Sequence, residues 1–419
     1  MDLKRFLLYF ITFLVYTQGF LERFTFFPAS GMIEVCVWVL ILASFNPKVG
    51  LGWMVGFILV GLYAAMSTNT VIPFFKHIRF LFYFYVVFTA LWNMRFSVAG
   101  FGRYLRFNVA MVLLQGIASV INLTFFGRTE YYVGAMSSLG GTTATTFPLF
   151  VFVILLVVYY YSSFSKKTLW HFCILLMIAS VFLMAFSSGK RAVFYYIPSY
   201  LAGITIICSF TIKKHAGRKL LLVIGLVILF SPLFFWGLKH ASGINDNLSG
   251  NERKKEIAVA ALDYATFYEE SQTKKGSTTG RSNSTEAILK QAVASKKGWF
   301  MGNGFGLMKD ENEIAKVGVR YGFVGFSRDV FSGGIVFALY AAVLMIVLIF
   351  RKDVETKDGF SKVMRISIAL VFVVVHFTYS SDFMVSLKLN MILAPLLCFL
   401  NSANYVHIKE YYCTKYLNR

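Results

Sequence analysis

The sequence predicts an all-α, polytopic membrane protein of about twelve transmembrane helices, with one large, partly helical loop outside the bilayer. Its 419 residues are 57% hydrophobic and 18% aromatic, and their mean hydropathy is +0.65. Only 15% of the residues are charged, whereas soluble chains carry about 25%. This composition excludes a soluble globular enzyme, a disordered tail and a coiled coil.

Apolar and aromatic runs recur along the chain and are separated by short polar breaks. Each run is long enough to form a transmembrane helix, in which a segment satisfies its own backbone groups in lipid. The predicted spans are 6–22, 31–47, 50–67, 77–96, 105–126, 146–164, 169–187, 192–212, 220–238, 330–350, 363–380 and 383–404.

The basic residues fall mainly on one side of the predicted membrane. When alternate breaks are assigned to opposite sides, about twenty basic residues lie on one side against roughly six in the other short breaks, and basic residues concentrate on the cytoplasmic side. Both termini are therefore predicted to be cytoplasmic, and the first apolar run, which lacks a clear cleavage site, is predicted to be a retained helix. The net charge of +21 then records membrane orientation, so no nucleic-acid partner is expected. The cytoplasmic set is Lys4, Arg5, Lys48, Arg95, Arg103, Arg106, Lys166, Lys167, Lys213, Lys214, Arg218, Lys219, Arg351, Lys352, Lys357, Lys362, Arg365, Lys409, Lys415 and Arg419.

One long polar stretch, residues 239–329, is predicted to face the periplasm. It separates residues 1–238, which hold the first nine spans, from residues 330–419, which hold the last three spans and a cytoplasmic tail. Loops of this length are usually functional or disordered. A helix is predicted in 253–271, because apolar residues recur there three and four apart, as one helix face requires. They are Ile257, Ala261, Tyr264 and Tyr268.

A second helix in this loop is predicted to start at a capping box formed by Asn283 and Glu286 and to stop at Gly298. A Gly-rich turn, residues 302–306, follows it. Ordinary packing explains the apolar stripes of both helices, so we expect the loop to fold onto the membrane domain. The apolar face of the second helix is Ile288, Leu289, Ala292 and Val293.

Two arginines mark a candidate anion site. Arg281 lies just ahead of the second helix, where free backbone N–H groups and a guanidinium can bind a phosphate together. Lys190 and Arg191 lie at an external helix end, against the positive-inside trend. Arg191 and Arg281 can therefore hold one anion at the outer headgroup level. The alternatives are a solvated loop arginine at Arg281 and basic side chains that only snorkel at Lys190 and Arg191.

The other ionisable residues give weaker signals. There is no Walker loop, HExxH motif, Cys/His ligand set or pair of intramembrane carboxylates, so we predict no metal and no cofactor. Glu34 is the only acid well inside a span; it is either functional or close enough to a boundary to face water. Lys388, near the outer end of the last span, can snorkel. His376 lies near a span end and shows no ligand spacing.

Three short motifs, taken in order, resemble those of the O-antigen polymerase and O-antigen ligase superfamily of bacterial membrane glycosyltransferases. The first is SSGKRA, residues 187–192, at the start of a span. The second is Arg281 followed by a helix and GWFMGNGFG, residues 298–306, in the large loop. The third is SGGIVFALYAAVL, residues 332–344, at the Gly-rich start of the next span.

The resemblance implies a metal-independent glycosyltransferase of the GT-C type in the bacterial cytoplasmic (inner) membrane. Such an enzyme takes its glycan from an undecaprenyl-diphosphate carrier and transfers it to a sugar hydroxyl at the periplasmic face. The resemblance favours a polymerase of O-antigen, capsule or exopolysaccharide repeat units. By position, Arg191 and Arg281 would bind the donor diphosphate, with Lys190 as a further candidate contact, and positioned guanidiniums can stabilise the charge that develops on this leaving group. The implied partners are the lipid-linked oligosaccharide, membrane lipid and a chain-length regulator protein.

One departure from the family pattern concerns the general base. Ligases of this superfamily carry a His shortly before the Gly-rich start of the span, and residues 318–331 contain none. Asp329 is the nearest candidate for accepting a hydroxyl proton, although it can equally be half of a surface ion pair. Arg320 and Arg328 are candidates for further phosphate contacts. The alternatives to a polymerase are a ligase that transfers glycan to lipid A–core and a lipid-linked oligosaccharide flippase or other secondary transporter.

Overall fold

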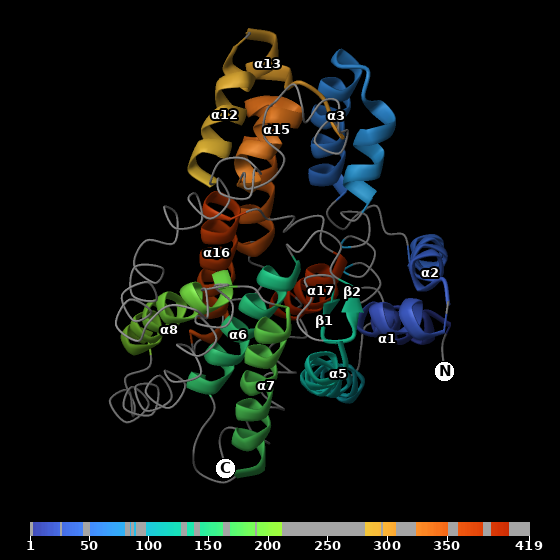
Figure 1. Ribbon diagram of the computed structural model, residues 1–419, viewed down its shortest axis with the longest axis vertical. Coiled ribbons are helices and arrows are strands. Elements are labelled where there is room, and N and C mark those ends of the chain that lie inside the picture. Colours follow the sequence, from blue (N-terminus) through green and yellow to red (C-terminus); the bar gives the residue numbers. More distant parts are fainter. Residues whose placement is uncertain are drawn as a thin grey trace, which may run out of the picture.

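The chain folds as a multi-pass, all-α membrane protein (Figure 1). Within the part of the chain that the structure describes, four helices are long and apolar enough to cross a bilayer: Gly102–Phe125, Thr143–Tyr160, Gly325–Phe350 and Phe360–Thr378. The computed structural model describes residues 3–25, 27–44, 51–79, 84, 88, 98–126, 132–137, 143–161, 168–188, 191–211, 281–294, 296–306, 324–350, 359–379 and 387–401.

The apolar helices overlap the predicted spans, so the all-α membrane fold is confirmed for the described part of the chain. The predicted span 220–238 and nearly all of 77–96 lie outside the described residues. So does the predicted loop helix 253–271. The helices are α1 (Leu3–Phe24), α2 (Ala29–Ser44), α3 (Leu51–Ser67), α5 (Val98–Phe126), α6 (Thr143–Tyr161), α7 (Thr168–Ser187), α8 (Arg191–Thr211), α15 (Gly325–Phe350), α16 (Phe360–Thr378) and α17 (Leu387–Asn401).

Helix α6 lies at the centre of the bundle. Its apolar window is 83% buried, against 33% for that of α5, so α6 is enclosed by other helices while α5 lies at the periphery. It packs against α7, α8, α16 and α17, and Figure 1 shows it among them. Since lipid is as apolar as these side chains, close packing and hydrogen bonds between helices hold such a bundle together.

One end of the bundle is held by a buried arginine, and we call it the Arg365 end. Arg365 of α16 is 4% exposed and donates from Nε to Ser361 Oγ at 3.2 Å. Its Nη1 donates to the carbonyl of Ile349, at the end of α15, and its Nη2 donates to the carbonyl of Leu400, at the end of α17, at 2.7 Å. The last carbonyls of a helix have no intrahelical partner. Arg365 therefore caps two helices at once.

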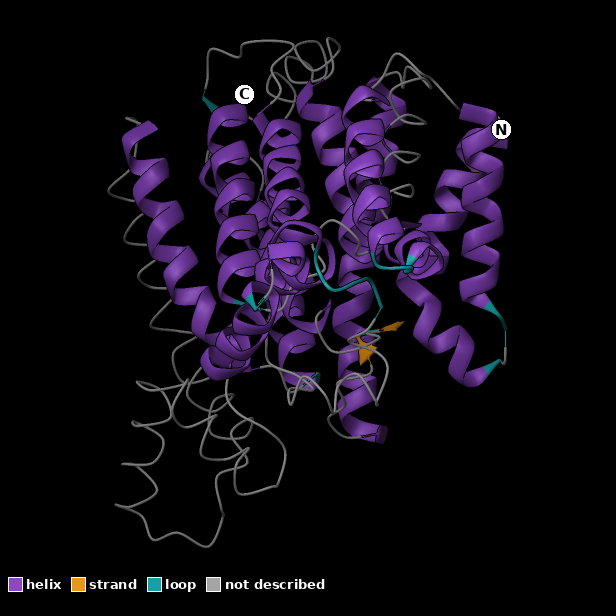
Figure 2. Cartoon of the chain, turned by 90° about the horizontal axis from the view of Figure 1, so that it is seen from above, coloured by secondary structure: helices purple, strands orange, loops and turns teal. Residues whose placement is uncertain are grey.

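The opposite end, which we call the Asp329 end, joins three helix starts to the end of α16. Gly325 N, at the start of α15, donates to Tyr379 O at 3.1 Å. The Tyr379 hydroxyl is 2.9 Å from Thr145 Oγ1, near the start of α6. Near the start of α8, the hydroxyl of Tyr196 is 2.9 Å from Thr378 Oγ1. The relative directions of α6, α8, α15 and α16 therefore agree with the alternation predicted from the sequence. Figure 2 shows that the described part of the chain is almost entirely helical.

A small antiparallel hairpin, which the sequence did not predict, joins α5 to α6 at the Asp329 end. Its strands are β1 (Tyr132–Val133) and β2 (Met136–Ser137). Two amides of α5 hold its turn: Gln115 Oε1 accepts from Ala135 N at 2.8 Å, and Asn122 Nδ2 donates to Gly134 O at 2.7 Å. These side chains satisfy turn groups that would otherwise be buried without partners.

Candidate functional site at the Asp329 end

The predicted second loop helix is present, but its limits differ from the prediction. It forms α12 (Arg281–Val293), and a short helix α13 (Lys296–Met301) follows. The predicted capping box is wrong, because the helix begins at Arg281 and Asn283 is already inside its first turn. Arg281 is thus the first helical residue. Gly298 does not stop the helix either, since α12 ends at Val293 and Gly298 is buried within α13.

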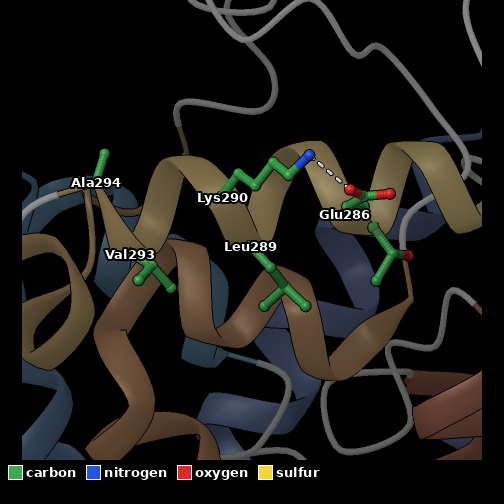
Figure 3. A pocket seen from close by; sticks show the side chains of 6 residues that line it. Glu286, Leu289, Lys290, Val293 and Ala294 are labelled. Carbon is green, nitrogen blue, oxygen red and sulfur yellow. Dashed lines mark ion pairs between the residues drawn. The ribbon is translucent and has the colours of Figure 1, made fainter.

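Helix α12 packs on the first turns of α15. Ile288 and Ala292 are fully buried, and Ala292 packs in one apolar cluster with Val330 and Ala338. Near the start of α12, the hydroxyl of Thr285 accepts a hydrogen bond from Val324 N at 3.3 Å. The two helices run side by side in Figure 3. The expectation that the loop folds onto the membrane domain is confirmed for α12 and α13.

The predicted apolar face of α12 is confirmed in part, because Val293 is 56% exposed. Val293 helps to line a hollow of about 660 Å³ along α12 (Figure 3). Lys290 and Glu286 form an ion pair of 2.6 Å at its edge. The hydrogen bond from Lys290, together with its charge, lowers the pKa of the Glu286 carboxyl. The hollow is lined by Thr285, Glu286, Leu289, Lys290, Val293 and Ala294.

Helix α15 is broken at Gly334, and the Gly-rich turn after α13 fills the break. Gly334 has φ 80° and ψ 173°, a conformation open almost only to glycine. The break leaves the carbonyls of Phe331 and Ser332 without intrahelical partners, and they accept from Asn303 N at 2.7 Å and Gly304 N at 3.1 Å. Non-helical backbone at membrane depth is tolerated where protein buries it. The second and third sequence motifs therefore dock onto each other.

The turn is also anchored on the far side, against α3. Phe305 N donates to Thr70 Oγ1 at 3.0 Å, just beyond the end of α3. The Phe305 ring lies 4.9 Å from that of Phe74 and 5.2 Å from that of Phe337, between centroids. Residues 302–306 thus tie α3 to the broken helix and fix the direction of its first segment, residues 325–333.

This first segment carries Arg328 and Asp329. Asp329 is 8% exposed, so the alternative of an ordinary surface ion pair is wrong. Its Oδ1 lies 3.7 Å from Arg328 Nη2, and its Oδ2 lies 3.8 Å from Nε2 of His376 in α16. His376 is 5% exposed, and its ring stacks on Phe372 with 5.1 Å between centroids. A buried carboxylate next to a buried imidazole can orient the ring and move a proton.

His376 is the site residue that sequence reasoning missed. It lies on the helix after the one that bears Asp329, so no local spacing links the two residues. The available signal was the predicted topology. The start of the predicted span 330–350 and the end of the predicted span 363–380 lie on the same side of the membrane. Asp329 and His376 are also potential metal ligands, but within the described ranges they have no third His, Cys, Asp or Glu beside them.

The helices led by Arg191 and Arg281 both reach this end of the bundle. Helix α8 begins at Arg191 and contacts Thr378 through Tyr196. Helix α12 begins at Arg281 and contacts Val324 through Thr285. Val324 and Thr378 flank the Gly325–Tyr379 hydrogen bond, so the two helices meet one junction from different sides. The side chains of Arg191 and Arg281 lie outside the described atoms, and Lys190 and Arg320 lie outside the described residues.

Glu34 and Lys388, which the sequence also singled out, lie away from the junction. Glu34 forms an ion pair of 3.1 Å with Arg79, and both side chains are nearly half exposed. This favours the boundary position for Glu34. Lys388 is 8% exposed, so most of its side chain is buried.

No protein-family model matches this chain, and no curated protein matches it. The resemblance to the O-antigen polymerase and ligase superfamily therefore remains an expectation based on the three motifs.

Proposed function

We propose that the chain is a polymerase of undecaprenyl-diphosphate-linked polysaccharide repeat units, acting at the outer face of the bacterial cytoplasmic membrane. The observation that carries the proposal is the junction at the Asp329 end. There, two helices that begin with arginine meet the segment holding Arg328 and Asp329, with His376 against Asp329. Anion-binding groups and a proton acceptor are the two elements that transfer from a diphosphate carrier requires.

The proposal places the Asp329 end in the periplasm and the Arg365 end in the cytoplasm, with about twelve spans and both termini inside. The orientation follows from charge. The starts of α1 and α5 lie opposite the Asp329 end, and they carry Arg5, Arg103 and Arg106 close to Tyr9. Basic residues concentrate on the cytoplasmic side.

The donor's diphosphate is the leaving group in this reaction. Arg191 and Arg281, each at a helix start, can bind it with guanidinium and free backbone N–H groups. Arg328 lies beside Asp329 and can add a third cation, while Lys190 and Arg320 are further candidates from the sequence. Charge that develops on the diphosphate as its bond to the sugar breaks is stabilised most by cations already in place.

The acceptor sugar hydroxyl must lose a proton as it attacks. In the proposed step the hydroxyl oxygen bonds to the anomeric carbon, the bond from this carbon to the diphosphate oxygen breaks, and His376 takes the proton. Asp329 orients the imidazole and stabilises the imidazolium that forms. His376 thus supplies the base that the loop sequence lacks, and Asp329 serves as a positioning residue.

A ligase is the second candidate, and His376 favours it as well. The sequence argument against a ligase was the absence of His from residues 318–331, and α16 now brings an imidazole to the same place. A deletion strain separates the two. Loss of a polymerase leaves single repeat units on the surface glycolipid, whereas loss of a ligase leaves none. A flippase is the third candidate; such transporters bind substrate near the bilayer midplane, and the junction lies at one end of the helices.

The test replaces the junction residues and measures the chain length of surface polysaccharide on a gel. Arg191→Ala and Arg281→Ala should each abolish long chains while the protein stays in the membrane, and Arg→Lys should also impair them because lysine lacks the bidentate fork. His376→Gln should slow polymerisation about 100-fold or more. Lys362→Ala, at an exposed position near the Arg365 end, is the matched control. Normal chain lengths in both arginine variants would refute the proposal.

A further inference from the structure

A second polar cluster lies at the Asp329 end, on the other side of α6 and α17. It is formed by Gln18 and Glu22 of α1, Ser30 of α2 and Lys388 of α17. Ser30 is exposed and Glu22 half-buried, whereas Gln18 is 4% and Lys388 8% exposed. The polar groups therefore lead inward from the surface to a buried floor.

The carboxylate of Glu22 is held through one of its two oxygens. Glu22 Oε1 accepts from Ser30 N at 3.0 Å, from Gln18 Nε2 at 3.3 Å and from the Ser30 hydroxyl. Gln18 Nε2 also donates to Ser30 Oγ at 2.8 Å. Among the described residues nothing donates to Gln18 Oε1, although it is buried. Within the described part of the chain, two acceptors, Gln18 Oε1 and Glu22 Oε2, thus have no hydrogen-bond donor.

Lys388 provides the matching donor. Its ammonium makes no hydrogen bond or ion pair with the residues that the structure describes, and the charge that acts on it is that of Glu22. Burying an ammonium without partners is costly, so intramembrane lysines usually serve a ligand or a charged partner.

We propose that this cluster, the Lys388 site, binds a sugar residue of the acceptor glycan. Adjacent sugar hydroxyls each donate and accept, which matches one ammonium beside two open acceptor oxygens. The cluster holds one cation, Lys388, and one anion, Glu22. A diphosphate therefore fits it poorly, whereas the arginine junction suits a diphosphate. The inference rests on the proposed function, because a polymerase must hold two glycans and the junction accounts only for the donor.

The Lys388 site is linked to the junction through helix α6. Helix α17 packs on α6 and α1, and α6 contacts the junction through Thr145 and Tyr379. Figure 1 shows α17 on the α1 side of α6, with α16 and α8 on the other side. An acceptor glycan held by Lys388 would thus approach His376 from the α1 side of α6, opposite to α8.

The test compares purified wild type with Lys388→Met and Gln18→Leu, using Lys362→Met as control. The donor is the labelled lipid-linked repeat unit, and the acceptor is the free repeat-unit oligosaccharide released from the host's polysaccharide. Both site variants should raise the acceptor KM at least tenfold and leave the donor KM within twofold. Lys388→Met should melt at or above the wild-type temperature, because it removes a buried charge that has no hydrogen bond or ion pair among the described residues.

Three outcomes would overturn the inference. They are an unchanged acceptor KM in both site variants, an equal rise of both KM values, and a lower melting temperature of Lys388→Met with no selective loss of acceptor. Failure of the proposed function is seen separately, as a wild-type protein that lengthens no glycan. In that case, binding of the free oligosaccharide measured by saturation-transfer NMR still decides the inference. A signal that the wild type gives and Lys388→Met lacks supports it. No signal in the wild type, or an equal signal in both proteins, contradicts it.

Discussion

Substituting Gly334 by alanine tests whether the break in α15 is a requirement of the fold. A Cβ at this position would overlap the carbonyl group of Phe300 and lie 2.7 Å from Met301 N. These are backbone atoms of α13, so no side-chain rotation relieves the overlap. The backbone angles alone cost a residue with a side chain about 1–3 kcal/mol, and displacing α13 adds about 1–3 kcal/mol.

We therefore expect Gly334→Ala to destabilise the protein by about 2–6 kcal/mol. At about 2–4 °C per kcal/mol, the melting temperature in detergent should fall by at least about 4 °C. The variant should also lose long-chain product, because the break sets the direction of the segment that carries Asp329. Gly31→Ala is the control, since no atom lies within 4 Å of its new Cβ and alanine favours the helix. If Gly334→Ala has the same melting temperature as the wild type, the geometric argument for the break is wrong.

Two further substitutions test how the helices are joined. Arg365→Met should lower stability by about 2–5 kcal/mol, because two buried helix-terminal carbonyls lose their donor; thermal melting beside the exposed Lys362→Met checks this, and equal melting would contradict it. Gln115→Ala should cost about 2–4 kcal/mol, since it removes the bond to Ala135 N and the bond from Nε2 to Tyr16 O at 3.2 Å. Gln115→Ala should also speed hydrogen exchange at the hairpin amides. The exposed control Thr124→Ala should leave this exchange unchanged. Unaltered protection in Gln115→Ala would count against the role of the Gln115 side chain.

The loop shows where sequence reasoning reached its limit. The spacing of Ile288 and Ala292 correctly placed α12 and its buried face, because helical periodicity is a local property. The capping signal at Asn283 placed the start of the helix three residues too late, since a helix start also depends on the segment it packs against. Gly298 was read as a stop signal, yet the chain continues through it as α13 and turns only at residues 302–306.

The sequence by itself predicted the apolar helices that the structure describes, four of which are long and apolar enough to cross a bilayer. Transfer of about 20 apolar residues into lipid is decided within each segment, and the charge at its ends sets its orientation. Only the tertiary structure decided which polar groups meet. It set His376 beside Asp329, docked the turn of residues 302–306 onto the broken helix, and buried Lys388 where α17 packs on α1. These contacts join residues far apart in the chain. Because packing between helices creates them, no local sequence pattern could predict them.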